Sequence, residues 1–321
     1  ERKYRKAQEA GLRHPAVDLG LARVHRAMAN QKEARISYEA AGRHQPFFVP
    51  ALHEYAAWEF SEGNFRNLRA VVEKTETAID KSEFEPTCNA GEQMADLQKF
   101  RLVVRALEDA VLRLNEGGHR EALSEFWPLF RTYKMNCPLI RNMILMFVRA
   151  DWLVTGALRM AEAFPDEGVY DLYARGQVAW HSKKEEDALT AFNHAIDRCL
   201  VHPLVFCARA QALAMQGDGE GAKRDLLRAY DWNPHLTVPR LSLAMRALDM
   251  NDHMSVLEYA ELTTEETEDA CRYDVNGHED VARLESLALK ALLRLGNKRT
   301  LLARARETRI WKAHGNLCFM T

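Results

Sequence analysis

Side chains that could carry acid–base, nucleophilic or metal chemistry occur in this chain, but none falls into a catalytic pattern. The twelve histidines include no H-x3-H or HExxH pair, the spacing that sets two zinc ligands on one helical face. The GxSxG turn of serine hydrolases and the glycine-rich loops that hold phosphates are also absent. Paired acids such as Glu185-Glu186 and Glu265-Glu266 fall at expected turns or solvated faces. We therefore expect no catalytic residues and no enzyme activity in this chain.

The six cysteines lack metal-site spacing as well, since no CxxC pair occurs among Cys88, Cys137, Cys199, Cys207, Cys271 and Cys318. Free cysteine usually behaves as a small buried apolar residue. Such use of cysteine is typical of a reducing, intracellular compartment, with the cytoplasm as first choice. Because the chain starts at Glu1, a targeting peptide would not be visible in it. We expect neither a metal nor a cofactor.

Charge and hydropathy narrow the classes of partner. A net charge of −2 does not favour a protein that coats nucleic acid by bulk electrostatics. The longest apolar run, MILMFV at 143–148, is much shorter than the roughly 20 residues that a membrane-spanning helix needs. Insertion into a membrane is therefore not expected.

A regular repeat organises the middle of the chain. Residues 174–195 read ARGQVAWHSKKEEDALTAFNHA and residues 208–229 read ARAQALAMQGDGEGAKRDLLRA. The identical residues in register are Ala174 and Ala208, Arg175 and Arg209, Gln177 and Gln211, Ala188 and Ala222, and Ala195 and Ala229. Each copy has two apolar runs at helical spacing around a polar break. The repeating unit is therefore predicted to be a helix–turn–helix.

Small residues mark the places where the two helices of a unit must approach closely. Gly176 and Ala210 lie in the first helices, and Ala188 and Ala222 lie early in the second. A large side chain at these positions would push the helices apart. One more step of the same length, taken from Ala210, reaches Ala244 among leucines, which indicates a third copy.

The same interval extends the array in both directions. We expect an N-terminal helix and then seven helix pairs, near residues 15–48, 49–76, 99–138, 139–167, 169–202, 203–236 and 237–268. Residues 77–98 have the composition of an insertion or long connection, and a last pair from about 280 to 313 would cap the array. The predicted segments are thus 1–76, 77–98, 99–268 and 269–321, the last an acidic linker followed by basic capping helices. The predicted fold class is all-α, a right-handed superhelical solenoid of antiparallel helix pairs.

The segment Ala188-Leu-Thr-Ala-Phe192 is an A-x3-F, and Ala34-Arg-Ile-Ser-Tyr38 repeats it with Tyr for Phe. With the upstream Gly or Ala, a downstream Pro and the interval from Ala174 to Ala208, these residues resemble the tetratricopeptide pattern. The leading Trp of that pattern is replaced by Leu172 and Phe206. Residues 33–41 and 55–74, EARISYEAA and YAAWEFSEGNFRNLRAVVEK, resemble instead the half-a-tetratricopeptide (HAT) repeats of RNA-processing scaffolds.

The tetratricopeptide resemblance implies a concave groove lined by the first helix of each pair. Mapped onto 169–181, its groove-facing positions fall on one helical face. The groove candidates over all units are Tyr170, Tyr173, Gln177, Trp180, His181, Gln211, Met215, His53, Phe60, Arg23 and Arg26. Aromatic rings flanked by amides and histidine can anchor an extended peptide or a partner helix, although inter-repeat packing would use the same residue types.

The family's clamp for the acidic tails of chaperones needs Lys and Asn at the groove positions. Leu19, Arg23, His53, Ala57, Tyr173, Gln177, Cys207 and Gln211 stand there instead, so the clamp does not carry over. Near the C-terminus an acidic stretch, 256–280, precedes a basic one. The basic stretch could bind phosphate or simply cap the array, with Arg294, Lys298, Arg299, Arg304, Arg306 and Arg309 as its candidate residues.

Three functional hypotheses remain. The leading one is a non-enzymatic scaffold that holds a partner peptide or helix in its groove within a larger assembly. The second is an RNA-associated HAT-type repeat protein that uses the basic C-terminal pair and Arg23, Arg26 and Arg35 of the first unit. The third is the helical arm of a larger enzyme whose catalytic domain lies outside this chain.

Overall fold

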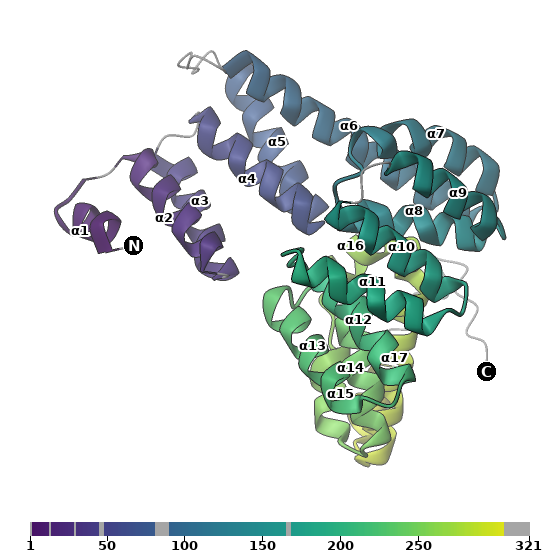
Figure 1. Ribbon diagram of the computed structural model, residues 1–321. Coiled ribbons are helices and arrows are strands. Elements are labelled where there is room, and N and C mark those ends of the chain that lie inside the picture. The colour runs from purple at the N-terminus through teal and green to yellow at the C-terminus, as the bar shows by residue number, and fades with distance from the viewer. Residues whose placement is uncertain are drawn as a thin grey trace. The chain divides into compact units, whose positions relative to one another are not determined.

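Every regular element in the described part of the chain is an α-helix. The computed structural model describes residues 2–12, 14–28, 30–44, 48–80, 90–164 and 168–304, and no strand occurs among them (Figure 1). The helices are α1 (Arg2–Glu9), α2 (Pro15–Ala27), α3 (Gln31–His44), α4 (Val49–Glu62), α5 (Phe65–Asp80), α6 (Ala90–Asn115), α7 (His119–Thr132), α8 (Cys137–Arg149), α9 (Leu153–Ala163), α10 (Val169–His181), α11 (Glu185–Asp197), α12 (Pro203–Met215), α13 (Gly219–Trp232), α14 (Thr237–Asp249), α15 (His253–Ala260), α16 (Thr264–Tyr273) and α17 (Gly277–Arg294). A short helix over 298–304 follows α17.

The helices of the expected pairs are present, and the prediction of an all-α array is confirmed. α2 packs against α3, α4 against α5, α10 against α11, α12 against α13 and α14 against α15. The first helices of the last three of these pairs begin at residues 169, 203 and 237, at the even interval that the sequence predicts. The handedness of the array stays a prediction.

The turns inside the pairs follow the same period. Lys183, Gly217 and Asn251 each close a first helix with a positive φ, at +61°, +85° and +56°. A left-handed residue at this place ends the helix and reverses the chain. Glycine adopts this conformation without strain, whereas a lysine needs the surrounding helix pair to hold it there. The tight turn is therefore imposed by the packing of the pair as well as by local sequence.

The small residues singled out in the sequence lie at the contacts between paired helices. Ala188, Ala210 and Ala222 are buried, and so is Gly176. A cluster formed by Phe206, Ala210, Ala222, Leu226 and Ala229 joins α12 to α13. The prediction that these positions are buried is confirmed.

The chain divides into two compact units, residues 1–107 and 108–321, with the division inside α6. The centre of unit 1 is aromatic: Tyr38 of α3 stacks on Tyr55 of α4 at 5.0 Å between ring centroids, and both rings contact Trp58. The core of unit 2 continues from pair to pair and ends in a cluster of α14, α15 and α17 that includes Ala244, Val256 and Leu284.

The observed elements differ from the predicted segments in two places. Residues 77–80 and 90–98, expected in a connection, belong to α5 and α6, and residues 81–89 lie outside the described part. Residues 264–273 form α16, which runs from the end of the last predicted pair into the expected acidic linker and starts with a capping box between Thr263 and Glu266. That reciprocal pair of hydrogen bonds satisfies two backbone donors at the helix start, so an acidic segment becomes a helix.

Candidate functional site at the inner face of unit 2

The first helices of successive pairs in unit 2 pack on one another. α10 contacts both α8 and α12, and α12 contacts α14 as well as α8. These four helices form a layer that we call the inner face. The layer brings residues from four different pairs into one neighbourhood.

A cavity of about 110 Å³ opens on the inner face. Four of the groove candidates line it: Gln177, Trp180 and His181 from α10 and Gln211 from α12. The remaining lining residues were not among the groove candidates and are Arg141, Leu145, Leu204, Cys207, Ala208, Val238 and Asn276. Arg141 and Leu145 are four residues apart, as are Cys207 and Gln211. This shared spacing is the pattern in the sequence that could have indicated corresponding faces on α8 and α12.

The polar side chains of this cavity keep hydrogen-bonding capacity. Within the described residues, the side chains of Trp180, His181 and Gln211 make no hydrogen bond, and each residue is only partly buried. The amide nitrogen of Gln177 donates to the hydroxyl of Tyr173 at 3.2 Å, which leaves its amide oxygen as an acceptor. An indole N–H, an imidazole and two amides therefore converge on one hollow.

The titratable groups of the cavity are held uncharged, apart from Arg141. Burial, together with the positive charges of Arg141 and Lys183, lowers the pKa of His181 to about 4. Burial raises the pKa of the Cys207 thiol to about 12. At neutral pH the histidine is a neutral donor and acceptor and the thiol is protonated. The guanidinium of Arg141 is already paired with Asp274. The cavity is therefore suited to an uncharged polar group such as a peptide unit.

Tyr173 and Tyr170 do not reach this hollow. Tyr173 is completely buried, with its ring 6.1 Å from that of Phe192, so this groove candidate does not face an open groove as its position predicted. The reason is that α8 and α12 both pack on α10, with Cys137 and Arg141 of α8 and Cys207 of α12 close to the Tyr173 side chain. Tyr170 is partly exposed at the start of α10. Met215 is 64% exposed at the end of α12 and does not line the cavity.

The groove candidates of unit 1 are engaged inside that unit. Phe60 is buried and stacks on Phe100, which corrects the expectation of an open groove position. His53 lies beside Asp96, with 3.6 Å between Nε2 and the nearer carboxylate oxygen. The Nε of Arg23 donates to Glu54 at 2.9 Å, and Arg26 lies over the ring of Trp58.

Of the basic C-terminal candidates that the structure describes, one is paired within the fold and three are exposed. Arg304 makes a two-pronged contact with Glu285, at 2.7 and 2.9 Å. Arg294, Lys298 and Arg299 are exposed. Arg306 and Arg309 lie outside the described residues.

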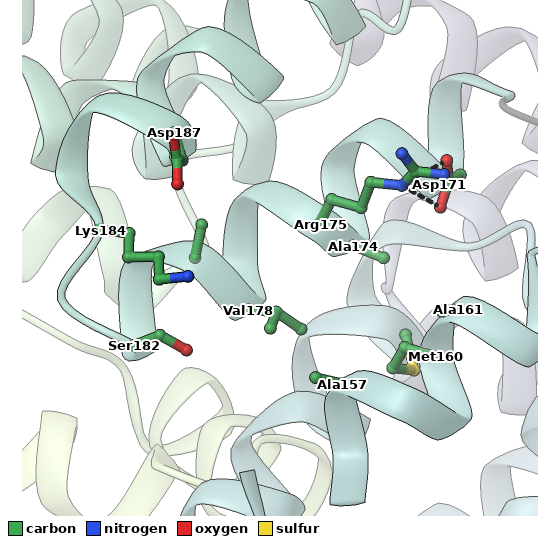
Figure 2. A pocket seen from close by; sticks show the side chains of 11 residues that line it. Ala157, Met160, Ala161, Asp171, Ala174, Arg175, Val178, Ser182, Lys184 and Asp187 are labelled. Atoms are coloured by element: carbon green, nitrogen blue, oxygen red, sulfur yellow. Dashed lines mark hydrogen bonds and ion pairs between the residues drawn. The ribbon is translucent and has the colours of Figure 1, made fainter. Parts of the chain in front are cut away.

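A second hollow, of about 270 Å³, lies between α9, α10 and the start of α11, against the other face of α10 (Figure 2). Ala157 and Met160 of α9 and Ala174 and Val178 of α10 give it an apolar floor. The buried carboxylate of Asp171 is paired with Arg175, whose Nε lies 3.0 and 2.9 Å from its two oxygens (Figure 2). This hollow fits an apolar side chain. Its signal in the sequence was the spacing of four between Ala157 and Ala161 and between Ala174 and Val178.

Among the described residues, no group of three His, Cys, Asp or Glu side chains is arranged to hold a metal ion. In the same residues, no helix combines the length and hydropathy that crossing a membrane requires.

The even interval between first helices, the paired packing and the small buried residues together define the repeat. The array is tetratricopeptide-like. No family model matches the chain, and no curated protein matches it. Among solved structures, the crystal structure of the P58(IPK) TPR domain aligns over 98% of this chain and 94% of its own, with 12% identity and a TM-score of 0.38. The HAT resemblance of the first units of this tetratricopeptide-like array stays a prediction.

Proposed function

We propose that this chain is a non-enzymatic scaffold that holds an extended segment of a protein partner at the inner face of unit 2. Trp180, His181 and Gln211 would contact that segment, with Gln177 offering its amide oxygen. The observation that carries the proposal is the convergence of these side chains on one cavity, where the side chains of Trp180, His181 and Gln211 make no hydrogen bond within the described structure.

The chemistry of the cavity favours a peptide over other ligands. A peptide unit presents one N–H donor and one C=O acceptor, and amides and neutral imidazole can meet both. The indole of Trp180 adds apolar area and a single donor, the combination that makes Trp a frequent energetic anchor at interfaces. Main-chain recognition of this kind holds a partner whose side chains can vary.

The RNA hypothesis is less well supported by the placement of its arginines. Arg23 and Arg26 face Glu54, at 2.8 and 3.6 Å, and Arg35 pairs with the buried Glu59 at 2.9 Å. Phosphate contact by these side chains would require breaking those pairs. Arg304 is likewise held by Glu285. A protein partner is therefore favoured over RNA.

The test selects binding peptides from a display library of short random sequences on the purified chain. Lead peptides are then titrated against Trp180→Ala and Gln211→Ala. Each substitution should weaken binding by about 2 kcal/mol if its side chain is an anchor. Gln216→Ala is the matched control, because Gln216 is exposed just beyond α12 and does not line the cavity.

Affinity capture on the intact chain, with and without nuclease, separates the two partner classes. Protein partners that survive nuclease and are lost with Trp180→Ala support the proposal. Partners that disappear with nuclease favour RNA, and peptides that bind both variants as tightly as the wild type contradict the site.

A further inference from the structure

Helix α8 is buried on almost every side, unlike the other first helices of unit 2. Ten of its residues are buried, from Cys137 to Phe147, and they include Asn142. A helix of an array normally leaves one side open toward solvent, as α10 does at Trp180 and α12 at Gln211. The side of α8 that would be open is covered by a segment far along the chain, residues 273–280, which we call the return segment.

Asn142 holds the main chain of the return segment from both directions. Its amide nitrogen donates to the carbonyl of Tyr273 at 3.0 Å, and its amide oxygen accepts from the N–H of Val275 at 2.9 Å. Such a pair of hydrogen bonds reads a peptide backbone without regard to side chains. Val275 and Tyr273 are themselves buried in this contact.

Two arginines of α8 complement the acidic side chains of the return segment. Arg141 pairs with Asp274 at 2.5 Å and lies 3.9 Å from Asp280. Arg149 donates to the amide oxygen of Asn276 at 3.3 Å and lies 3.9 Å from Glu279. Basic side chains at both ends of the contact and an amide between them form a peptide-binding surface for an acidic turn.

The return segment also forms one wall of the cavity assigned above. Asn276 lines that cavity together with Arg141, Gln211 and Trp180. A partner segment that enters the cavity therefore meets the return segment, and both compete for space along the same inner face.

We propose that the return segment is an internal ligand of the inner face, and that an acidic segment of the protein partner displaces it from α8. This inference rests on the proposed function, since it extends the same site. The internal segment has the advantage of a high effective concentration, so the partner gains access only when it adds contacts in the cavity. The partner is accordingly a protein with an acidic turn next to an extended stretch.

The experiment uses the full chain and a labelled synthetic peptide with the sequence of residues 272–281. Asp274→Asn weakens the internal copy by removing its charged contact with Arg141. The variant should bind the peptide about tenfold or more tightly than the wild type does, since a hydrogen bond to a charged group contributes about 1.5–3 kcal/mol. Glu258→Gln, the same loss of charge at an α15 residue outside this contact, is the control and should bind as the wild type does.

Adding Arg141→Gln to Asp274→Asn should abolish the gain, because the docking surface is then lost. Amide hydrogen exchange on the wild type gives the second measurement: Val275 should exchange faster than the amides of α8 and α12, through an opening smaller than global unfolding.

Any of three results overturns the proposal. The peptide could bind Asp274→Asn and the wild type with equal affinity, the Val275 amide could exchange only through global unfolding, or Asp274→Asn could fail to fold. Each would make the return segment a permanent part of the core. None depends on Trp180 or Gln211, so the proposed cavity can survive the failure of this inference.

Discussion

The ring of Phe192 occupies the space that a side chain at Gly176 would need: a Cβ built on Gly176 would lie 2.4 Å from the ring. Gly156 and Phe147 repeat this relationship between α9 and α8, at 2.5 Å. Phe192 is the last residue of the A-x3-F segment that begins at Ala188. Gly176 of α10 and Phe192 of α11 therefore form one contact between the paired helices, in which the glycine makes room for the ring.

Gly176→Ala tests this contact. Alanine favours a helix over glycine by about 1 kcal/mol, but the displaced ring should cost about 1–3 kcal/mol, so we expect a net loss of stability. Gly42→Ala is the control, since Gly42 is also helical and a Cβ there meets no atom within 4 Å. Urea unfolding of both variants checks the pair, and equal stabilisation by both would contradict the close approach.

Tyr173 and Trp180 lie on the same face of α10 and should respond differently to substitution. Tyr173→Ala removes a completely buried ring and should cost roughly 3–5 kcal/mol of folding free energy. Trp180→Ala removes a partly exposed ring at the cavity and should change stability less, while weakening binding of a selected peptide. Melting temperature and affinity measured on the same samples separate the two roles. A Trp180→Ala protein that unfolds like Tyr173→Ala, with unchanged affinity per folded molecule, would end the groove hypothesis.

Asp280 should make stability fall as pH rises. Burial, with the neighbouring charge of Asp274, raises the pKa of Asp280 to about 7 in the folded chain, against 3.8 as its ordinary value. Between these values the unfolded chain binds fewer protons than the folded chain, so the free energy of unfolding decreases as pH increases through this window. Asp280→Asn removes the effect, and its advantage over the wild type should be larger at about pH 8 than at about pH 5. Denaturant titrations at both pH values test this, and parallel pH profiles would show that Asp280 does not ionise in this way.

Arg35 tests whether the basic residues of unit 1 are structural. Its Nε lies 2.9 Å from the completely buried carboxylate of Glu59, which also accepts from Asn64, and its guanidinium covers the ring of Trp58. Arg35→Ala leaves a buried charge without its cation and should cost about 3–5 kcal/mol. Arg69→Ala, which breaks an exposed pair with Glu73, should cost about 1 kcal/mol or less. A stable Arg35→Ala protein that loses binding to RNA would favour the second functional hypothesis.

Local sequence determined the repeat and its elements. A helix pair forms from contacts within one repeat, and the residues that permit it, such as Gly176, Ala188 and Ala222, are small where the backbones meet. Because each pair contacts mainly its neighbours, the period and the small residues could be read without knowing the rest of the fold. The same locality explains why Gln177, Trp180, His181 and Gln211 could be predicted to share a face: they lie at corresponding positions of first helices and line one cavity.

Tertiary structure alone decided how far each face is covered. Tyr173 and Trp180 share one side of α10, but α8 and α12 cover Tyr173 and leave Trp180 partly exposed. Helical spacing predicts the direction in which a side chain points, but it does not predict how closely other helices pack over it. The return segment is the clearest case, since Asn142 meets Tyr273 and Val275 across 131 and 133 residues of chain. The repeat period cannot predict such a contact, because the contact depends on how the successive helix pairs of unit 2 position its last helices.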